Sequence, residues 1–106
     1  MLPFNSGGRT PAYDLEVQRL VGQGPVSCRV SQAALDGGRV LGFNYGRIIE
    51  AVLCLQRADF YKTMPSAQVP GTWQDVYHLE YDGASLYVKL QINVRGEAVV
   101  IQFKEK

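Results

Sequence analysis

The C-terminal part of the chain repeats polar side chains at every second position. Between residues 86 and 94, apolar residues alternate with Tyr87, Lys89 and Gln91. Because successive side chains of a β-strand point to opposite faces, this spacing separates a polar set from an apolar set. Lysine is normally protonated at neutral pH and suits phosphate binding, and it acts as a base only where burial or neighbouring charges lower its pKa. The pattern therefore predicts one core face and one face that carries lysine, tyrosine and amide groups.

The neighbouring segments extend both faces. Over residues 73–81 one parity is largely aromatic and apolar, and after a turn at Arg95-Gly96 the residues Val99, Ile101 and Phe103 are expected to continue the core face. The residues expected on the other, open face are Gln74, Tyr87, Lys89, Gln91, Gln102 and Lys104. On the pattern alone a solvated surface explains this open face, because antiparallel sheets commonly expose one polar side.

Other residue types narrow the possible chemistry. His78 is the only histidine, so the chain cannot build a histidine pair, and an ordinary strand histidine is the simpler interpretation. No zinc-ligand spacing, P-loop, GxSxG or dinucleotide-binding motif is present in the sequence. Ordinary surface charge explains the carboxylates Asp59, Asp75, Glu80 and Asp82. The sequence therefore predicts neither a metal site nor a bound cofactor.

The cysteines indicate the redox environment of the protein, and the net charge limits its possible partners. Cys28 and Cys54 lack CxxC spacing and have apolar neighbours, which favours two buried free thiols in a reducing cytoplasm, with a single disulfide as the alternative. The net charge is +1. Because nucleic-acid-binding domains usually carry a basic surplus, an RNA-binding surface on this chain would have to be a local patch.

Helical periodicity dominates the first half of the chain. A short amphipathic helix is expected at about residues 14–22 with Asp14 as its cap, followed by a short strand or extended connector over residues 25–30. Ser31 is expected to cap a brief helix that Gly37-Gly38 ends. Asn44 is expected to cap a longer helix, whose wide apolar stripe makes it the main packing partner of the sheet. Residues 57–72 are expected to form a connecting segment and loop.

The second half predicts a three-stranded antiparallel meander over residues 72–81, 85–94 and 97–106, with an Asp82-Gly83 turn. Helices followed by strands indicate an α+β fold with helices packed on one face of an antiparallel sheet. With 106 residues the chain is one domain, 1–106, of which residues 1–11 are expected to be a flexible lead-in. No signal peptide and no membrane-spanning stretch is present, so a cytoplasmic protein is expected.

Four short pieces carry a family resemblance: "DFYKTM", "WQDVY", "LYVKL" and the terminal "FKEK". In this order and spacing they resemble the MqsR family of motility quorum-sensing regulator toxins, most clearly over residues 55–106. The resemblance implies a RelE-like α+β fold and a metal-independent ribonuclease that cuts messenger RNA at GCU-type sites. It also implies a type II toxin–antitoxin pair in which a zinc-binding antitoxin of the MqsA type neutralises the toxin. The functional residues that it implies are Lys62, Gln74, Tyr87 and Lys104.

Strand parity independently places Gln74, Tyr87 and Lys104 on the open face, and Lys62, in the preceding connector, is expected to reach the same edge. Our hypothesis assigns phosphate binding and proton transfer to the two lysines. Tyr87 would donate a hydrogen bond or carry a proton, and Gln74 would hold the phosphate or a base edge.

The expected substrate is single-stranded, and the expected products are a 2′,3′-cyclic phosphate and a 5′-hydroxyl. Which lysine acts as base stays open. The alternative function is a non-catalytic module that binds RNA or protein through the open sheet face.

Overall fold

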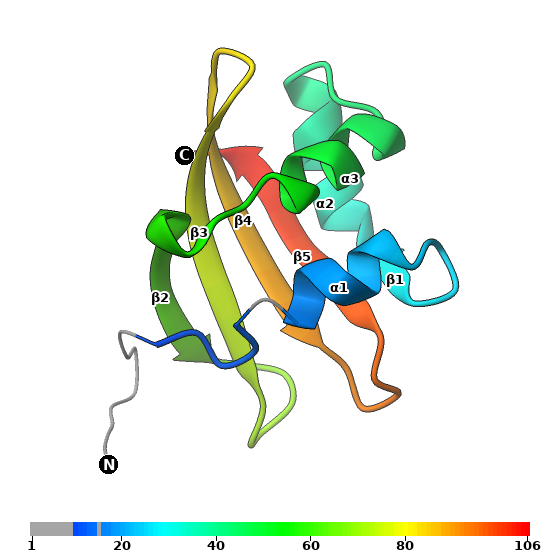
Figure 1. Cartoon of the computed structure of the whole chain (residues 1–106), viewed down its shortest axis with the longest axis vertical. Helices are drawn as coiled ribbons and strands as arrows, with labels where there is room; N and C mark the ends of the chain where they lie inside the picture. Colours follow the sequence, from blue (N-terminus) through cyan, green and yellow to red (C-terminus); the bar gives the residue numbers. More distant parts are fainter. Residues whose placement is uncertain (1–9, 15) are drawn as a thin grey trace.

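A computed structural model describes residues 10–14 and 16–106 (Figure 1). Its elements are α1 (Glu16–Gly22), β1 (Cys28–Val30), α2 (Gln32–Val40), α3 (Tyr45–Leu53), the 3₁₀ helix η1 (Arg57–Asp59), β2 (Phe60–Pro65), β3 (Trp73–Tyr81), β4 (Ala84–Ile92) and β5 (Ala98–Glu105). The predicted α+β class is confirmed. Most of the expected lead-in, residues 1–9, lies outside the described residues, and Pro11 at its end is buried.

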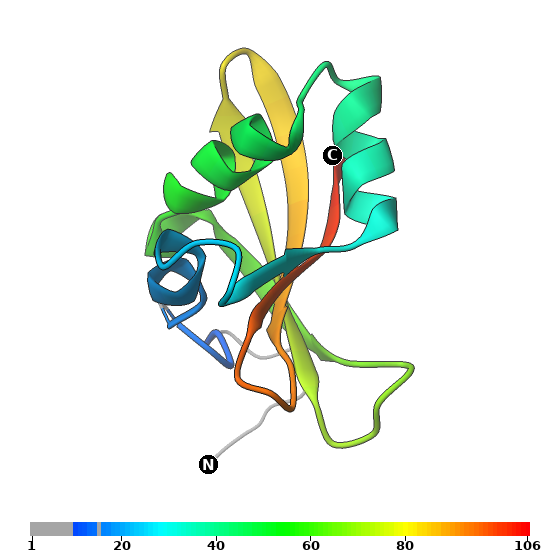
Figure 2. The same ribbon diagram turned by 90° about the vertical axis from the view of Figure 1, so that its right-hand side faces the viewer.

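The sheet has five strands in the order β1-β5-β4-β3-β2. Strands β2 to β5 pair antiparallel in sequence order, and β1 adds to β5 in parallel. Helices α1 and α3 cover one face (Figures 1 and 2), while α2 lies alongside β5. The three predicted strands are confirmed, but the prediction of a connector over residues 57–64 was wrong, because β2 forms there against β3. Strand β2 lies at the edge of the sheet, and its sequence FYKTMP does not alternate regularly between apolar and polar residues, so the pattern gave no strand signal.

Helix α2 runs through Gly37 and Gly38, where the sequence predicted its end. Both glycines allow close packing. A Cβ on Gly37 would lie 2.2 Å from the backbone oxygen of Phe103, and one on Gly38 would lie 2.7 Å from Cδ1 of Ile48. Ser31 caps this helix as predicted, since its hydroxyl accepts a hydrogen bond from the backbone N–H of Ala34 at 3.0 Å. The paired glycines therefore seat α2 against β5 and α3 instead of ending it.

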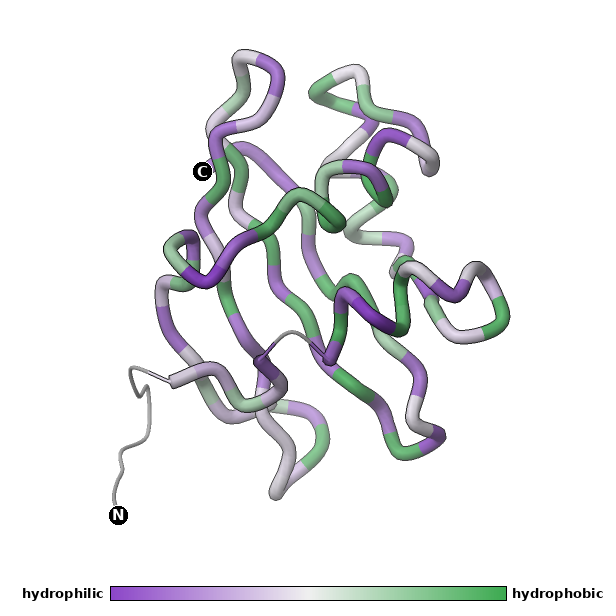
Figure 3. The backbone as a smooth tube through the Cα atoms, viewed as in Figure 1, coloured by the Kyte–Doolittle hydropathy of each residue, from purple (hydrophilic) through white to green (hydrophobic). Residues whose placement is uncertain are grey.

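The core lies between the sheet and the helices, and a β-bulge changes which residues of β5 enter it. Lys89 faces Gln102 across β4 and β5, but the next pair joins Leu90 to Val100, so Ile101 is the extra residue. Val100 is consequently fully buried, and the prediction that Val99 and Ile101 continue the core face was wrong. The alternation of apolar and polar residues along the strands is visible in Figure 3.

Asp75 is a buried carboxylate, although the sequence suggested ordinary surface charge. Its side chain is 1% exposed and accepts hydrogen bonds from the backbone N–H groups of Ala12 (2.8 Å) and Tyr13 (3.0 Å). These bonds, together with one from the Tyr13 hydroxyl to the backbone oxygen of Trp73 at 2.7 Å, attach the segment before α1 to β3. Asp75 thus has a structural role on the helix-covered side of the sheet.

Both cysteines are free thiols; Cys28 is buried as expected, but Cys54 is exposed at the end of α3. Among the described residues, no helix combines the length and the apolar character needed to cross a membrane.

Candidate active site

The face of the sheet opposite α1 and α3, which we call the open face, is organised in rows that cross the strands. The first row is Tyr61, His78, Tyr87 and Lys104. The second row is Lys62, Val76, Lys89 and Gln102. The third row is Met64, Gln74, Gln91 and Val99. All six residues that strand parity assigned to the open face lie on it.

Tyr87 and Lys104 form the best-defined contact of the first row. They are direct partners across β4 and β5, and the Lys104 Nζ lies 5.0 Å from the centre of the Tyr87 ring. The Nζ of Lys89 approaches the same ring at 6.0 Å. Two cationic groups therefore converge on one phenol.

Lys62 reaches the open face from β2 rather than from a connector. Its Nζ lies 5.6 Å from the centre of the Tyr61 ring. Tyr61 in turn stacks on His78, with ring centres 4.2 Å apart and planes inclined by 20°, and His78 lies 6.1 Å from the Tyr87 ring. The aromatic row thus connects Lys62 with Tyr87, and the exposed Tyr61 ring offers a surface on which a nucleobase can stack.

The apolar floor of the second row is Val76. It is 0% exposed even though it lies on the open face, and its partners across β2 and β4 are Lys62 and Lys89. Long lysine stems commonly cover apolar surface while their ammonium groups stay in water. The two half-buried lysines therefore have their stems held beside Val76, which limits where their ammonium groups can go.

Gln74 lies one row beyond the lysines. Its side-chain amide donates a hydrogen bond to the side-chain oxygen of Gln91 at 3.0 Å. This pair fixes the orientation of both amides at the margin of the lysine rows. Of the four residues implied by the family resemblance, Tyr87 and Lys104 are in contact, Lys62 joins them through the aromatic row, and Gln74 lies beside the group.

The lysines of the three rows form no ion pair with a carboxylate among the described residues. Every ion pair found among the described residues uses an arginine, so none of Lys62, Lys89 and Lys104 has a carboxylate oxygen within 4.0 Å there. Clustered cations of this kind attract an anionic ligand. Lys106, the remaining lysine, follows β5 and extends the positive potential along the same end of the sheet.

The titratable groups respond to this environment. Burial, and then the charges of Lys104 and Lys62, lower the pKa of Lys89 below its usual range. Burial, followed by Lys106 and Lys62, lowers the pKa of His78, which favours a neutral imidazole. Burial raises the pKa of Tyr87, with a smaller contribution from Tyr61, so its phenol stays protonated and can donate a hydrogen bond. The open face thus offers groups able to bind a phosphate and to transfer protons.

Sequence reasoning placed Lys89 on the open face but gave it no role, and it assigned neither Tyr61 nor His78 to the site. The strand character of β2 was the missing information for Tyr61, because without that strand its stacking on His78 is invisible. For His78, the sequence did hold a signal: it lies four residues after Gln74 in the same strand, so the two side chains are expected on the same face.

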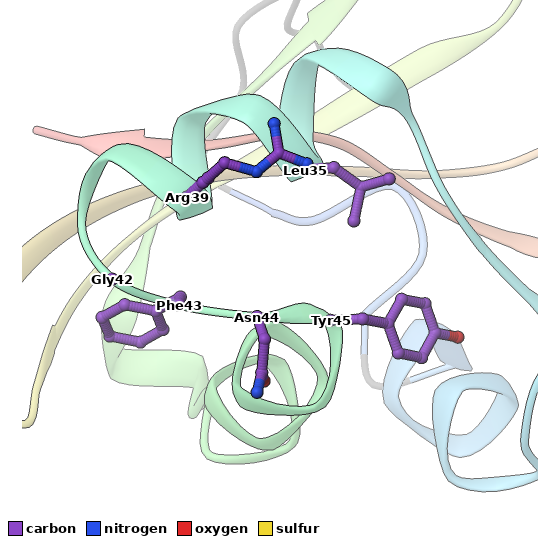
Figure 4. A pocket seen from close by; sticks show the side chains of 6 residues that line it. All are labelled: Leu35, Arg39, Gly42, Phe43, Asn44 and Tyr45. Carbon is purple, nitrogen blue, oxygen red and sulfur yellow. The ribbon is translucent and has the colours of Figure 1, made fainter.

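Away from the open face, a hollow of about 460 Å³ lies between α2 and α3. Figure 4 shows its lining, which is formed by Leu35, Arg39, Gly42, Phe43, Asn44 and Tyr45. Arg39 is paired with Asp36, and the Asn44 side chain is occupied in capping α3. The described lining of this hollow contains no histidine, lysine, cysteine or carboxylate side chain. In the described part of the chain, no three histidine, cysteine or carboxylate side chains gather as metal ligands would.

Fold and site together define a small α+β protein whose exposed sheet carries an unneutralised cluster of lysine and tyrosine side chains. The chain belongs to the family described as "Motility quorum-sensing regulator, toxin of MqsA", whose model matches residues 10–105. It is 33% identical over 99 residues to "mRNA interferase toxin MqsR" of Escherichia coli (strain K12), an alignment that covers 92% of this chain and 97% of that protein. The family predicted from the four sequence pieces is confirmed.

Proposed function

We propose that this protein is the toxin of a type II toxin–antitoxin pair and acts as a metal-independent endoribonuclease on single-stranded messenger RNA. The observation that carries the proposal is the placement of Lys89 and Lys104 beside Tyr87, with Lys62 connected to them through the aromatic row. None of these three lysines has a carboxylate partner among the described residues. The similarity to a named mRNA interferase toxin supports the choice of RNA as the anionic ligand. The preference for GCU-type sites rests on the family alone.

Cleavage of RNA without a metal requires protein side chains to perform three functions. The ribose 2′-hydroxyl must lose its proton as it attacks phosphorus, the charge of the phosphorane must be stabilised, and the departing 5′-oxygen must be protonated. Lys62 and Lys104 provide phosphate binding and proton transfer, and Tyr87 provides a hydrogen bond from its protonated phenol. Gln74 contacts the phosphate or a base edge from the margin of the site. This chemistry leaves a 2′,3′-cyclic phosphate and a 5′-hydroxyl.

The partner implied by this function is an antitoxin of the MqsA type, which binds zinc and suppresses the activity. The family description, "toxin of MqsA", names MqsA as the counterpart of the toxin. A toxin of this kind works in the cytoplasm, where messenger RNA is translated.

Induced expression in a bacterial host tests the proposal. The parent protein is expected to arrest growth with loss of message, and the Lys104→Ala variant is expected to do neither. Arg39→Ala, which removes a cation from α2 outside the rows, serves as the control and should arrest growth like the parent. Equal arrest by Lys104→Ala at equal protein level would contradict the site. A protein that binds RNA tightly but leaves message intact would instead support the non-catalytic module.

A further inference from the structure

Lys89 occupies the centre of the open face. Its strand, β4, is the middle strand of the order β1-β5-β4-β3-β2, and its cross-strand partners are Val76 and Gln102. Its Nζ lies 6.0 Å from the Tyr87 ring, which the Lys104 Nζ approaches at 5.0 Å. Lys62 lies on the far side of Val76. A phosphate held by Lys62 and Lys104 would therefore sit within reach of a third ammonium group.

The groups that face Lys89 come from four strands. Tyr61 and Lys62 lie on β2, His78 and Glu80 on β3, Tyr87 on β4 itself, and Lys104 on β5. Glu80 is at the far end of its strand, where the Ser85 hydroxyl donates to both of its carboxylate oxygens. The close charged neighbours are thus cations, and together with burial they lower the pKa of Lys89. A lysine whose pKa is lowered releases its proton more readily than an ordinary lysine and is a better general acid.

We propose that Lys89 is a further catalytic residue, the general acid that protonates the 5′-oxygen as it leaves phosphorus; this assignment rests on the proposed ribonuclease function. The bond from the 2′-oxygen to phosphorus forms while the 2′-hydroxyl proton departs to a base. The bond from phosphorus to the 5′-oxygen breaks, and that oxygen takes the proton from Lys89 Nζ. The resulting neutral amine regains a proton from water before the next turnover.

A chemically modified substrate separates proton donation from binding and from structural support. An RNA oligonucleotide with sulfur in place of the bridging 5′-oxygen has a leaving group that departs as a thiolate without protonation. Lys89→Met keeps an unbranched stem beside Val76 and removes the transferable proton. On ordinary RNA its rate of cleavage is expected to fall by about 100-fold or more. On the sulfur-bridged RNA it should cleave within a few-fold of the parent.

Lys89→Arg is a second variant, which retains a positive charge but holds its proton too tightly to donate it. It should show the same recovery on the sulfur-bridged substrate. Arg39→Met removes a cation from α2, away from the three rows, and is the control that should cleave both substrates like the parent. The rate of the parent on ordinary RNA should also fall as the pH rises through the pKa of Lys89, and this fall should be missing on the sulfur-bridged RNA.

If both Lys89 variants are equally slow on the two substrates, or unaffected on both, Lys89 is not the general acid, and the ribonuclease function stands. If the folded parent protein cleaves neither substrate, the ribonuclease proposal itself fails, and the role of Lys89 fails with it.

Discussion

The ammonium group of Lys104 lies 5.0 Å from the centre of the Tyr87 ring, and the two residues face each other directly across β4 and β5. The contact brings a cation and a protonated phenol together on the exposed side of the sheet. Tyr87 leaves from the interior of β4 and Lys104 from near the end of β5, and the pairing of the two strands fixes their separation. This pair is the best-defined contact of the proposed active site.

Tyr87→Phe tests the phenol while it preserves the ring over which Lys104 lies. Because the variant loses only a hydrogen-bond donor to the developing phosphorane, the rate of RNA cleavage should fall by about 100-fold with little change in thermal unfolding temperature. Tyr45→Phe removes a hydroxyl from an exposed ring on α3, away from the open face, and should leave the rate unchanged. Cleavage by Tyr87→Phe at the parent's rate would remove the hydroxyl from the mechanism.

Lys89→Met is expected to raise the Tm at neutral pH. The pKa of Lys89 is lowered in the folded protein, mainly by burial and then by Lys104 and Lys62, from the usual value of 10.5. The folded state therefore binds the Lys89 proton less well than the unfolded chain does. This difference lowers the free energy of unfolding, and the full loss is present at pH values below the folded-state pKa. The loss shrinks between that pKa and pH 10.5 and is absent above it.

Differential scanning fluorimetry across this pH range measures the effect. The Tm advantage of Lys89→Met over the parent should decrease as the pH approaches 10.5. An advantage that stays constant over the whole range would instead indicate better packing against Val76.

Gly37→Ala tests the close packing of α2 on β5. Alanine is ordinarily favoured over glycine inside a helix by about 1 kcal/mol. Here its Cβ would lie 2.2 Å from the backbone oxygen of Phe103, so the helix must shift. The free energy of unfolding in urea should drop by about 1–3 kcal/mol, as for other overpacked sites.

Gly46→Ala is the control within α3, because its Cβ would meet only the Asn44 side-chain oxygen, at an ordinary 3.5 Å. It should be neutral or stabilising. Equal effects of the two substitutions would mean that α2 does not pack against β5 as closely as described.

Strand alternation and turn residues were sufficient to predict the three-stranded meander and its open face. The Asp82-Gly83 turn has positive φ at both residues, 51° and 81°, as a two-residue hairpin turn requires, and it fixes the register of β3 and β4. Because the turn keeps that register regular, the alternation of residue types alone assigns Gln74, Tyr87 and Lys89 to one face.

The errors arise where tertiary contacts decide the local structure. The sequence predicts a helix end at Gly37 and Gly38. In the structure, these glycines instead allow close packing against Phe103 and Ile48, which lie in other elements of the fold. The bulge at Ile101 shifts the parity of β5 by one residue and has no signature in the local pattern. The predicted position of Lys62, in a connector at the edge of the open face, was only approximate for the same reason. Residues 60–65 form a strand through their pairing with β3, which the local pattern does not show.

The ends of the RNA fragments test the central claim most directly. Purified protein would be incubated with single-stranded RNA containing GCU sites in the presence of a chelator, beside the Lys104→Ala variant, and both ends of each cut would be mapped. We expect 5′-hydroxyl and 2′,3′-cyclic phosphate ends with the parent and intact RNA with the variant. Fragments that begin with 5′-phosphates, or RNA that the folded parent protein leaves intact, would contradict a lysine–tyrosine ribonuclease on this sheet.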